Sequence, residues 1–196
     1  TWGNLAHRAL TFAYKRFDGQ VPTPGTLDEL DASLLEKVEG GFDRVGELLA
    51  GCHFRAALGE VMNLAREANG YLEEKGPWFQ IKEDREAAAT TIYVVLKTID
   101  SLKVLFAPFL PFSSEQLHRY LGYENQLFGH QYTEMFEEEG GRVHEALCYD
   151  GSDAAGTWQP SELPAGQALR KPEPLFEALE EDVIEEERAQ LGIETA

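Results

Sequence analysis

The longest helical pattern in the sequence is KEDREAAATTIYVVLKTIDSLKVLF, residues 82–106. Its large apolar side chains recur every three or four residues, as they do on one face of an α-helix. These residues are Ile92, Val95, Leu96, Ile99, Leu102 and Phe106. Pro108 and Pro111 follow, and proline ends helices because it lacks the backbone N–H and clashes with the preceding turn. The sequence therefore predicts a long helix over 82–106 whose apolar face other helices can cover.

Shorter helical patterns lie on both sides of this one. Their ranges are 1–17, 27–49, 54–72 and 113–121. Thr26 is the expected N-cap of the second range, Ser113 or Ser114 is that of the last, and Gly76 lies near the C-cap of the third. Amphipathic helices joined by short loops are typical of a helical bundle. We therefore expect an all-α fold, a bundle of about five helices.

The helical pattern weakens after Tyr123. Residues 123–171 are rich in glycine, proline and turn-forming residues, which favours an irregular strap made mostly of loop. An extended segment, 172–176, leads into a strongly acidic pattern that we expect to be a helix over 175–191. The sequence thus predicts three regions: a bundle over 1–122, an irregular strap and linker over 123–174, and an acidic C-terminal helix within 175–196.

Composition narrows the classes of function. The 196 residues carry 35 acidic and 17 basic side chains, a net charge of −18, which argues against a general nucleic-acid binder and against docking on anionic lipid. The longest apolar run, Val104–Phe112, is too short to span a bilayer and the N-terminus shows no leader pattern, so we expect a cytoplasmic protein. The two cysteines, Cys52 and Cys148, are too sparse for a disulfide framework or a zinc site.

The negative charge is unevenly distributed along the chain. Residues 173–196 contain nine acidic side chains and one basic one, whereas residues 1–20 contain three basic side chains and one acidic one. The first expected helix is therefore locally positive. The net charge of the chain is a poor guide to what this helix binds.

Four polar residues lie on one stripe of this first helix: Asn4, Arg8, Thr11 and Lys15. Their spacing of 4, 3 and 4 places them within about 60° of one another around the helix axis. An amide reads base edges because it both donates and accepts hydrogen bonds, and a guanidinium stacks on bases or pairs with phosphate. An ordinary solvated face has the same spacing, and the spacing alone favours that interpretation.

A second candidate site is Pro77-Trp78-Phe79, in the expected turn before the longest helix. A tryptophan there can serve as a stacking platform for an unpaired base. Large aromatic side chains more often complete the core, and this residue alone favours the core interpretation. The five histidines are scattered and no catalytic or metal-binding motif is evident, so we expect neither an active site nor a metal site.

Four segments together resemble the C-terminal anticodon-binding domain of methionyl-tRNA synthetases. They are GNLAHRALTFAYKRFDGQVP (3–22), ANGYLEEKGPWFQIKEDR (68–85), LFAPFLPFSSEQLHRYLG (105–122) and LPAGQALRKPEPLF (163–176). Each is weak evidence alone, but they occur in order over nearly the whole chain and are specific together. The resemblance implies an α-helical bundle that follows the catalytic domain and recognises the CAU anticodon of methionine tRNA.

The family's anticodon readers lie in an Asn-Leu-x-x-Arg segment and a Pro-Trp pair, which here are Asn4, Arg8, Pro77 and Trp78. The resemblance implies that Trp78 stacks on the first anticodon base, a cytosine, while Asn4 and neighbouring backbone groups bond the edge of that base. It implies that Arg8 contacts a further base or the RNA backbone, and it gives His7 no role. The family motif thus favours the binding interpretation of both the stripe and the turn.

The family's ATP and methionine sites belong to its catalytic domain, whose signature sequences are absent here. The resemblance therefore implies the C-terminal part of a methionine–tRNA ligase, which has no cofactor of its own. ATP with Mg²⁺, and Zn²⁺, are expected in the catalytic domain, toward which residues 163–176 are expected to pack. The expected partners are methionine tRNA and that domain, and neither DNA nor a membrane.

Two alternatives stay open on the sequence. The first is the anticodon-binding domain of another class I synthetase, for isoleucine, valine, leucine or cysteine. The second is an acidic helical protein-interaction module without an RNA ligand. The second explains the net charge of −18 more simply, but it does not explain the polar stripe on the one locally positive helix.

Overall fold

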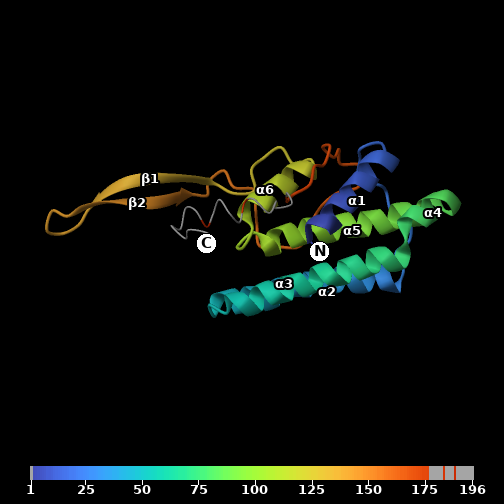
Figure 1. Ribbon diagram of the computed structural model, residues 1–196, viewed down its shortest axis with the longest axis horizontal. Helices are drawn as coiled ribbons and strands as arrows, with labels where there is room; N and C mark the ends of the chain where they lie inside the picture. Colours follow the sequence, from blue (N-terminus) through green and yellow to red (C-terminus); the bar gives the residue numbers. More distant parts are fainter. Residues whose placement is uncertain (1, 177–182, 184–187, 189–196) are drawn as a thin grey trace.

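The computed structural model describes residues 2–176, 183 and 188. In this part of the chain, six helices precede a two-stranded antiparallel sheet (Figure 1). These elements are α1 (Trp2–Arg16), α2 (Glu29–Ala50), α3 (Phe54–Lys75), α4 (Pro77–Glu83), α5 (Arg85–Phe106), α6 (Pro111–Tyr120), β1 (His130–Glu137) and β2 (Val143–Asp150). The expected acidic helix over 175–191 lies almost entirely outside the described residues. None of the described helices is both long enough and apolar enough to cross a membrane.

Helix α5 is the centre of the bundle. It contacts each of the other five described helices. Its predicted apolar stripe is completely buried, and burial of each such side chain contributes about 1.5–3 kcal/mol. Phe106, at its end, stacks on Trp2 with ring centroids 4.7 Å apart, which seats the start of α1 against the end of α5. The predicted helical bundle is confirmed.

Helices α2 and α3 form an antiparallel pair along one side of α5 (Figure 1). The N-cap of α2 is Asp28, whose carboxylate accepts hydrogen bonds from the backbone N–H groups of Leu30 and Asp31. Asp31 in turn accepts a hydrogen bond from the backbone N–H of Asp28. The prediction of Thr26 as N-cap was wrong, because this reciprocal pair of acids satisfies the free N–H groups and begins the helix two residues later.

Two other helices begin where the sequence did not predict. α5 begins three residues later than predicted, because Asp84 has an extended backbone (φ −143°, ψ 95°) and caps the helix with its carboxylate. The residues before Asp84 form α4, a separate helix of seven residues. α6 begins at Pro111 rather than at Ser113, since the missing N–H of proline needs no partner in a first helical turn.

The region predicted to be mostly loop contains a β-hairpin, so that prediction was wrong for residues 130–150. The two strands pair in register from His130 opposite Asp150 to Glu137 opposite Val143, and the turn between them contains two glycines with positive φ. The hairpin projects from the bundle, and both of its faces are largely exposed (Figure 1). Because neither face is buried, the strands lack the regular apolar–polar alternation by which strands are recognised.

The rest of the strap returns along the bundle. Leu163 and Leu169 are buried. The backbone N–H of Val21 donates to the carbonyl of Gln167 at 2.9 Å, and that of Leu169 donates to the carbonyl of Gly19 at 2.7 Å. Part of the segment that was expected to pack toward a catalytic domain thus packs on this bundle, against the loop after α1.

Candidate nucleic-acid interface

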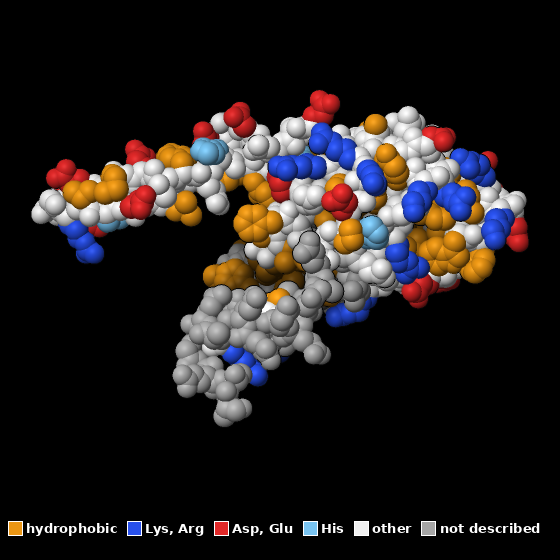
Figure 2. Space-filling model, turned by 45° about the horizontal axis from the view of Figure 1, so that its top comes forward, with side chains coloured by type: hydrophobic (Ala, Val, Ile, Leu, Met, Phe, Trp, Pro, Cys, Tyr) orange, Lys and Arg blue, Asp and Glu red, His pale blue; other side chains and the backbone are white. Residues whose placement is uncertain are grey.

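A pocket of about 400 Å³ opens between α1 and α4. The residues that line it come from α1, α3, α4 and α5: His7, Arg8, Ala9, Thr11, Phe12, Lys15, Arg16, Leu72, Pro77, Trp78 and Ile92. Figure 2 shows an apolar patch, surrounded by Lys and Arg side chains, toward the α4 end of the molecule. The pocket therefore combines mostly apolar walls with a positively charged rim.

Helix α1 turns one face to the core and another to this pocket. The core face consists of Trp2, Leu5, Ala6, Ala9, Leu10 and Ala13. In the predicted polar stripe, Arg8, Thr11 and Lys15 line the pocket. Asn4 is exposed, lies one turn before Arg8 and is not part of the lining. Three of the four residues of the stripe therefore form part of the pocket wall.

Trp78 is the second residue of α4 rather than part of a turn, which corrects the prediction. Gly76 ends α3 in the left-handed conformation (φ +54°, ψ +57°), as predicted, and Pro77 then starts α4. The half-buried Trp78 ring faces Arg8, whose guanidinium carbon is 4.8 Å from the ring centroid. Arg8, Pro77 and Trp78, three of the four predicted reader residues, thus meet in one pocket.

Arg8 contacts two neighbours at once. Its guanidinium lies over Trp78, and its Nη1 is 3.8 Å from Glu73 Oε1. Both contacts are partly exposed, and exposed cation–π contacts and ion pairs contribute about 1 kcal/mol or less. The guanidinium can therefore leave the Trp78 ring at little energetic cost.

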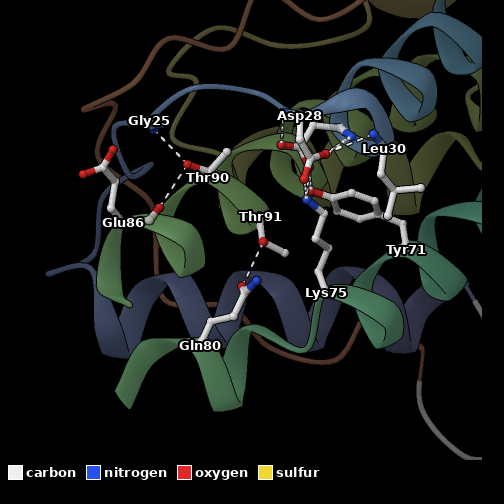
Figure 3. Close-up of polar contacts among 10 residues, drawn as sticks. Gly25, Asp28, Leu30, Tyr71, Lys75, Gln80, Glu86, Thr90 and Thr91 are labelled. Atoms are coloured by element: carbon white, nitrogen blue, oxygen red, sulfur yellow. Dashed lines mark hydrogen bonds and ion pairs between the residues drawn. The ribbon is translucent and has the colours of Figure 1, made fainter. Parts of the chain in front are cut away.

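A polar cluster behind the pocket fixes the junction of α3 and α4 (Figure 3). We call it the Lys75 cluster; it consists of Asp28, Asp31, Tyr71 and Lys75. Lys75 Nζ lies 2.6 Å from Asp28 Oδ2 and 2.7 Å from Asp31 Oδ1, and the Tyr71 hydroxyl donates to Asp31 Oδ1 at 2.7 Å. Because Lys75 directly precedes Gly76, the cluster ties the start of α2 to the edge of the pocket.

The pKa values of this cluster reflect its hydrogen bonds. The hydrogen bond from Lys75 holds the pKa of the Asp28 carboxyl below its ordinary value. Burial, and then the hydrogen bond to Asp31, raises the pKa of the Tyr71 hydroxyl. At neutral pH the cluster therefore contains an ionised Asp28 and a neutral Tyr71 whose hydroxyl donates a hydrogen bond to Asp31.

The rim of the pocket carries the positive charge of α1. Lys15 and Arg16 are exposed on its last turn. Arg85 joins them from the start of α5: its Nη2 donates to the carbonyl of Arg16 at 2.8 Å, and its guanidinium carbon is 5.0 Å from the Phe17 ring centroid. The excess of positive charge predicted for residues 1–20 is thus concentrated beside the pocket.

Two residues of the pocket region had no predicted role. His7 lies on the wall one turn before Thr11, a placement that its spacing of four residues could have indicated. Glu73, the neighbour of the Arg8 guanidinium, had no signal in the sequence, since the contact depends on how α1 packs against α3. No group of three or more His, Cys, Asp or Glu residues is placed to hold a metal ion in the part of the chain that the structure describes.

Residues 21–145 match the family model for the anticodon binding domain of methionyl tRNA ligase. This chain belongs to that family. The methionine–tRNA ligase of Thermomicrobium roseum is 56% identical over 193 residues, which are 97% of this chain and 33% of that protein. The ligase of Chloroflexus aurantiacus is 51% identical over 191 residues, which are 97% of this chain and 32% of that protein.

Solved structures are also similar to this methionyl-tRNA ligase domain. The apo form of Mycobacterium tuberculosis methionyl-tRNA synthetase has a TM-score of 0.69 and 25% identity over 90% of this chain and 31% of that chain. The same synthetase bound by methionyl-adenylate has a TM-score of 0.68 and 26% identity. The chain thus spans about a third of the length of the relatives that it matches. The match favours the methionine family over the other class I synthetases.

Proposed function

We propose that this domain reads the CAU anticodon of methionine tRNA, and that the pocket between α1 and α4 receives the first anticodon base, a cytosine. One observation carries the proposal: Arg8 and Trp78, far apart in the sequence, meet in one pocket with apolar walls. A base that leaves its own stack regains about 1–3 kcal/mol by stacking on an aromatic ring. Trp78 supplies that ring.

Arg8 and Asn4, one turn apart on α1, contact the RNA around this stacked base. As the base enters, Arg8 leaves the ring and contacts a further base or the RNA backbone, since its contacts with Trp78 and Glu73 are weak. Asn4, exposed on the preceding turn, bonds the edge of the base together with neighbouring backbone groups. Lys15 and Arg16 on the rim neutralise nearby phosphates.

The remaining roles belong to the whole ligase. We propose that the catalytic domain of the same enzyme attaches methionine to the tRNA with ATP and Mg²⁺, and that Zn²⁺, where the enzyme holds it, is bound there. A cytoplasmic location fits this role in protein synthesis. The residues of the present domain bind and position the anticodon, and no step assigned to them uses a metal or a nucleotide cofactor.

A titration with RNA tests the stacking role of Trp78. The ligand is a 17-nucleotide anticodon stem–loop with the sequence CAU, and the protein is the 196-residue chain. Trp78→Ala should weaken binding about 5- to 100-fold, which is the loss of one base–aromatic stack. Phe112→Ala is the matched control, because Phe112 is an 89% exposed aromatic residue on α6, outside the pocket. Equal affinities of the two variants would overturn the proposal.

A further inference from the structure

Two residues on the wall of the pocket each contain a buried polar atom that lacks a hydrogen-bond partner. These atoms are His7 Nδ1 and Thr11 Oγ1. The two residues are one helical turn apart on α1, and both line the same pocket as Trp78. In the described part of the chain five side-chain atoms are of this kind, and these two belong to residues that line this pocket.

The Thr11 hydroxyl differs from the hydroxyls of Thr90 and Thr91 on α5, which have hydrogen-bond partners. The Thr90 hydroxyl donates to the carbonyl of Glu86 one turn earlier on the same helix, at 3.0 Å. The Thr91 hydroxyl donates to the side chain of Gln80, also at 3.0 Å. Leaving a buried polar atom without such a partner destabilises a protein, and native structures rarely do so without a functional reason. A base that enters the pocket and reaches these two atoms would supply the missing partners.

The rest of the pocket offers few polar atoms to a base. Phe12, Leu72, Pro77 and Ile92 contribute apolar surface, and Asn4 is outside the lining. An apolar pocket discriminates weakly between bases of equal size, whereas buried polar atoms reject a base that leaves them unpaired. His7 and Thr11 therefore have the location and the chemistry to add specificity to stacking on Trp78.

We propose that Thr11 and His7 form hydrogen bonds with the edge of the base that stacks on Trp78. This inference rests on the proposed function and names two specificity-determining residues for the same site. A hydroxyl both donates and accepts, and an imidazole nitrogen does either, according to its tautomer. Cytosine presents an amino donor beside a ring-nitrogen acceptor, so the pair can satisfy both positions of this edge. A base that lacks the amino group leaves one of the two protein side chains without a hydrogen-bond partner.

Loss of the Thr11 hydroxyl should affect RNA binding and protein stability in opposite directions. Thr11→Val keeps the shape of the side chain and replaces an unpaired buried hydroxyl with a methyl group. We expect the melting temperature of the free protein to stay equal or to rise, while affinity for RNA falls. A residue with a structural role alone would not show this opposite pair of effects.

The experiment measures affinity for three anticodon stem–loops. Their first anticodon base is cytosine, uracil or 2-pyrimidinone, which lacks the amino group of cytosine. The wild-type chain should bind the cytosine loop about 10-fold more tightly than the other two. Thr11→Val and His7→Phe should bind the cytosine loop about 5- to 50-fold more weakly than wild type and should discriminate less. Thr11→Ser and His7→Asn, which keep a polar atom near the original one, should restore discrimination.

Thr98→Val is the matched control for these variants. Thr98 Oγ1 is also buried and without a partner, but the residue lies on α5 outside this pocket. Its affinity for all three loops should equal that of wild type. Suppose that the wild-type chain prefers the cytosine loop and that Thr11→Val and His7→Phe both prefer it by the same factor as wild type. This inference is then overturned while the proposed function stands. If the wild-type chain binds all three loops equally, both are overturned.

Discussion

Lys75 shows how one side chain supports the site from outside it. Its ammonium lies against Asp31, whose side chain is only 2% exposed. Lys75→Met would leave this carboxylate buried without its cation, and an uncompensated buried charge costs about 3–5 kcal/mol. We expect the free energy of unfolding, measured by urea denaturation, to fall by about 3 kcal/mol.

An exposed ion pair provides the matched control for Lys75. Lys37 Nζ and Glu67 Oε2 are also 2.7 Å apart, but their side chains are 56% and 46% exposed. Exposed pairs contribute about 0–1 kcal/mol, so Lys37→Met should change the free energy of unfolding by less than about 1 kcal/mol. Equal losses in the two variants would show that the Lys75 cluster has no special role.

His118 makes the stability of the domain depend on pH. Its Nε2 is 3.2 Å from Asn125 Oδ1, and its ring stacks on Tyr123 at a centroid distance of 4.3 Å. Burial, and then the nearby Lys103 ammonium, lowers the pKa of His118 below its ordinary value of 6.5. Just below pH 6.5 the unfolded chain therefore binds a proton that the native chain does not, so stability falls as the pH falls through this value.

Urea denaturation near pH 7.5 and pH 5.5 checks this direction. The wild-type chain should be less stable at the lower pH. His118→Phe keeps an aromatic ring on Tyr123 but removes the titrating group, so its loss between the two pH values should be smaller. An equal loss in both proteins would assign the pH dependence to other groups.

At the scale of elements, long apolar stripes were predictable and local boundaries were not. α5 was evident because its stripe repeats over the whole helix and is buried along its length. α4 was merged with it, since only the extended backbone of Asp84 separates the two helices. The cap of α2 depends on the hydrogen bonds between Asp28 and Asp31. The sequence pattern alone does not show which of several nearby polar residues will be the N-cap. The hairpin was missed because no core selects one of its faces.

The exposure of the hairpin predicts that the bundle folds without it. Residues 130–150 are exposed or half-buried throughout, and a two-stranded sheet alone adds little stability. Gly129 lies beside the backbone of Asp150, so a short Gly-Ser linker can replace this segment. We expect the free energy of unfolding to change by less than about 1 kcal/mol, and affinity for the CAU loop to stay equal. A weaker affinity would place the hairpin in the RNA interface.

At the scale of the whole molecule, the net charge of −18 is compatible with RNA binding because the negative charge is unevenly distributed along the chain. Residues 173–196, with nine acidic side chains and one basic one, account for nearly half of the negative excess, whereas Lys15 and Arg16 line the pocket and Arg85 contacts Arg16 beside it. The family resemblance pointed to four candidate reader residues, and the structure brings three of them, Arg8, Pro77 and Trp78, together in one pocket. The Lys75 cluster depends on how helices distant in sequence pack, which no local pattern contains, whereas the spacing of His7 and Thr11 places them on one side of α1.

This arrangement of charge predicts how salt affects binding. Arg16→Gln removes a rim charge without touching Trp78, so it should weaken binding of CAU and UAU stem–loops by the same factor. The slope of log affinity against log salt concentration should become shallower by about 0.7, the value for one contact with a single-stranded phosphate. Lys37→Gln, on α2 outside the pocket, should leave the slope unchanged. A change in the CAU-to-UAU ratio would mean that Arg16 reads a base.

The most direct test of anticodon reading is the ratio of two dissociation constants for the wild-type chain. CAU and UAU stem–loops differ only in the first anticodon base, so contacts with phosphate and with the stem cancel in the ratio. At one salt concentration we predict that the CAU loop binds about 10-fold more tightly, which corresponds to one lost base contact of about 1–3 kcal/mol. A ratio of one would contradict the assignment of the pocket between α1 and α4 as the reader of this base.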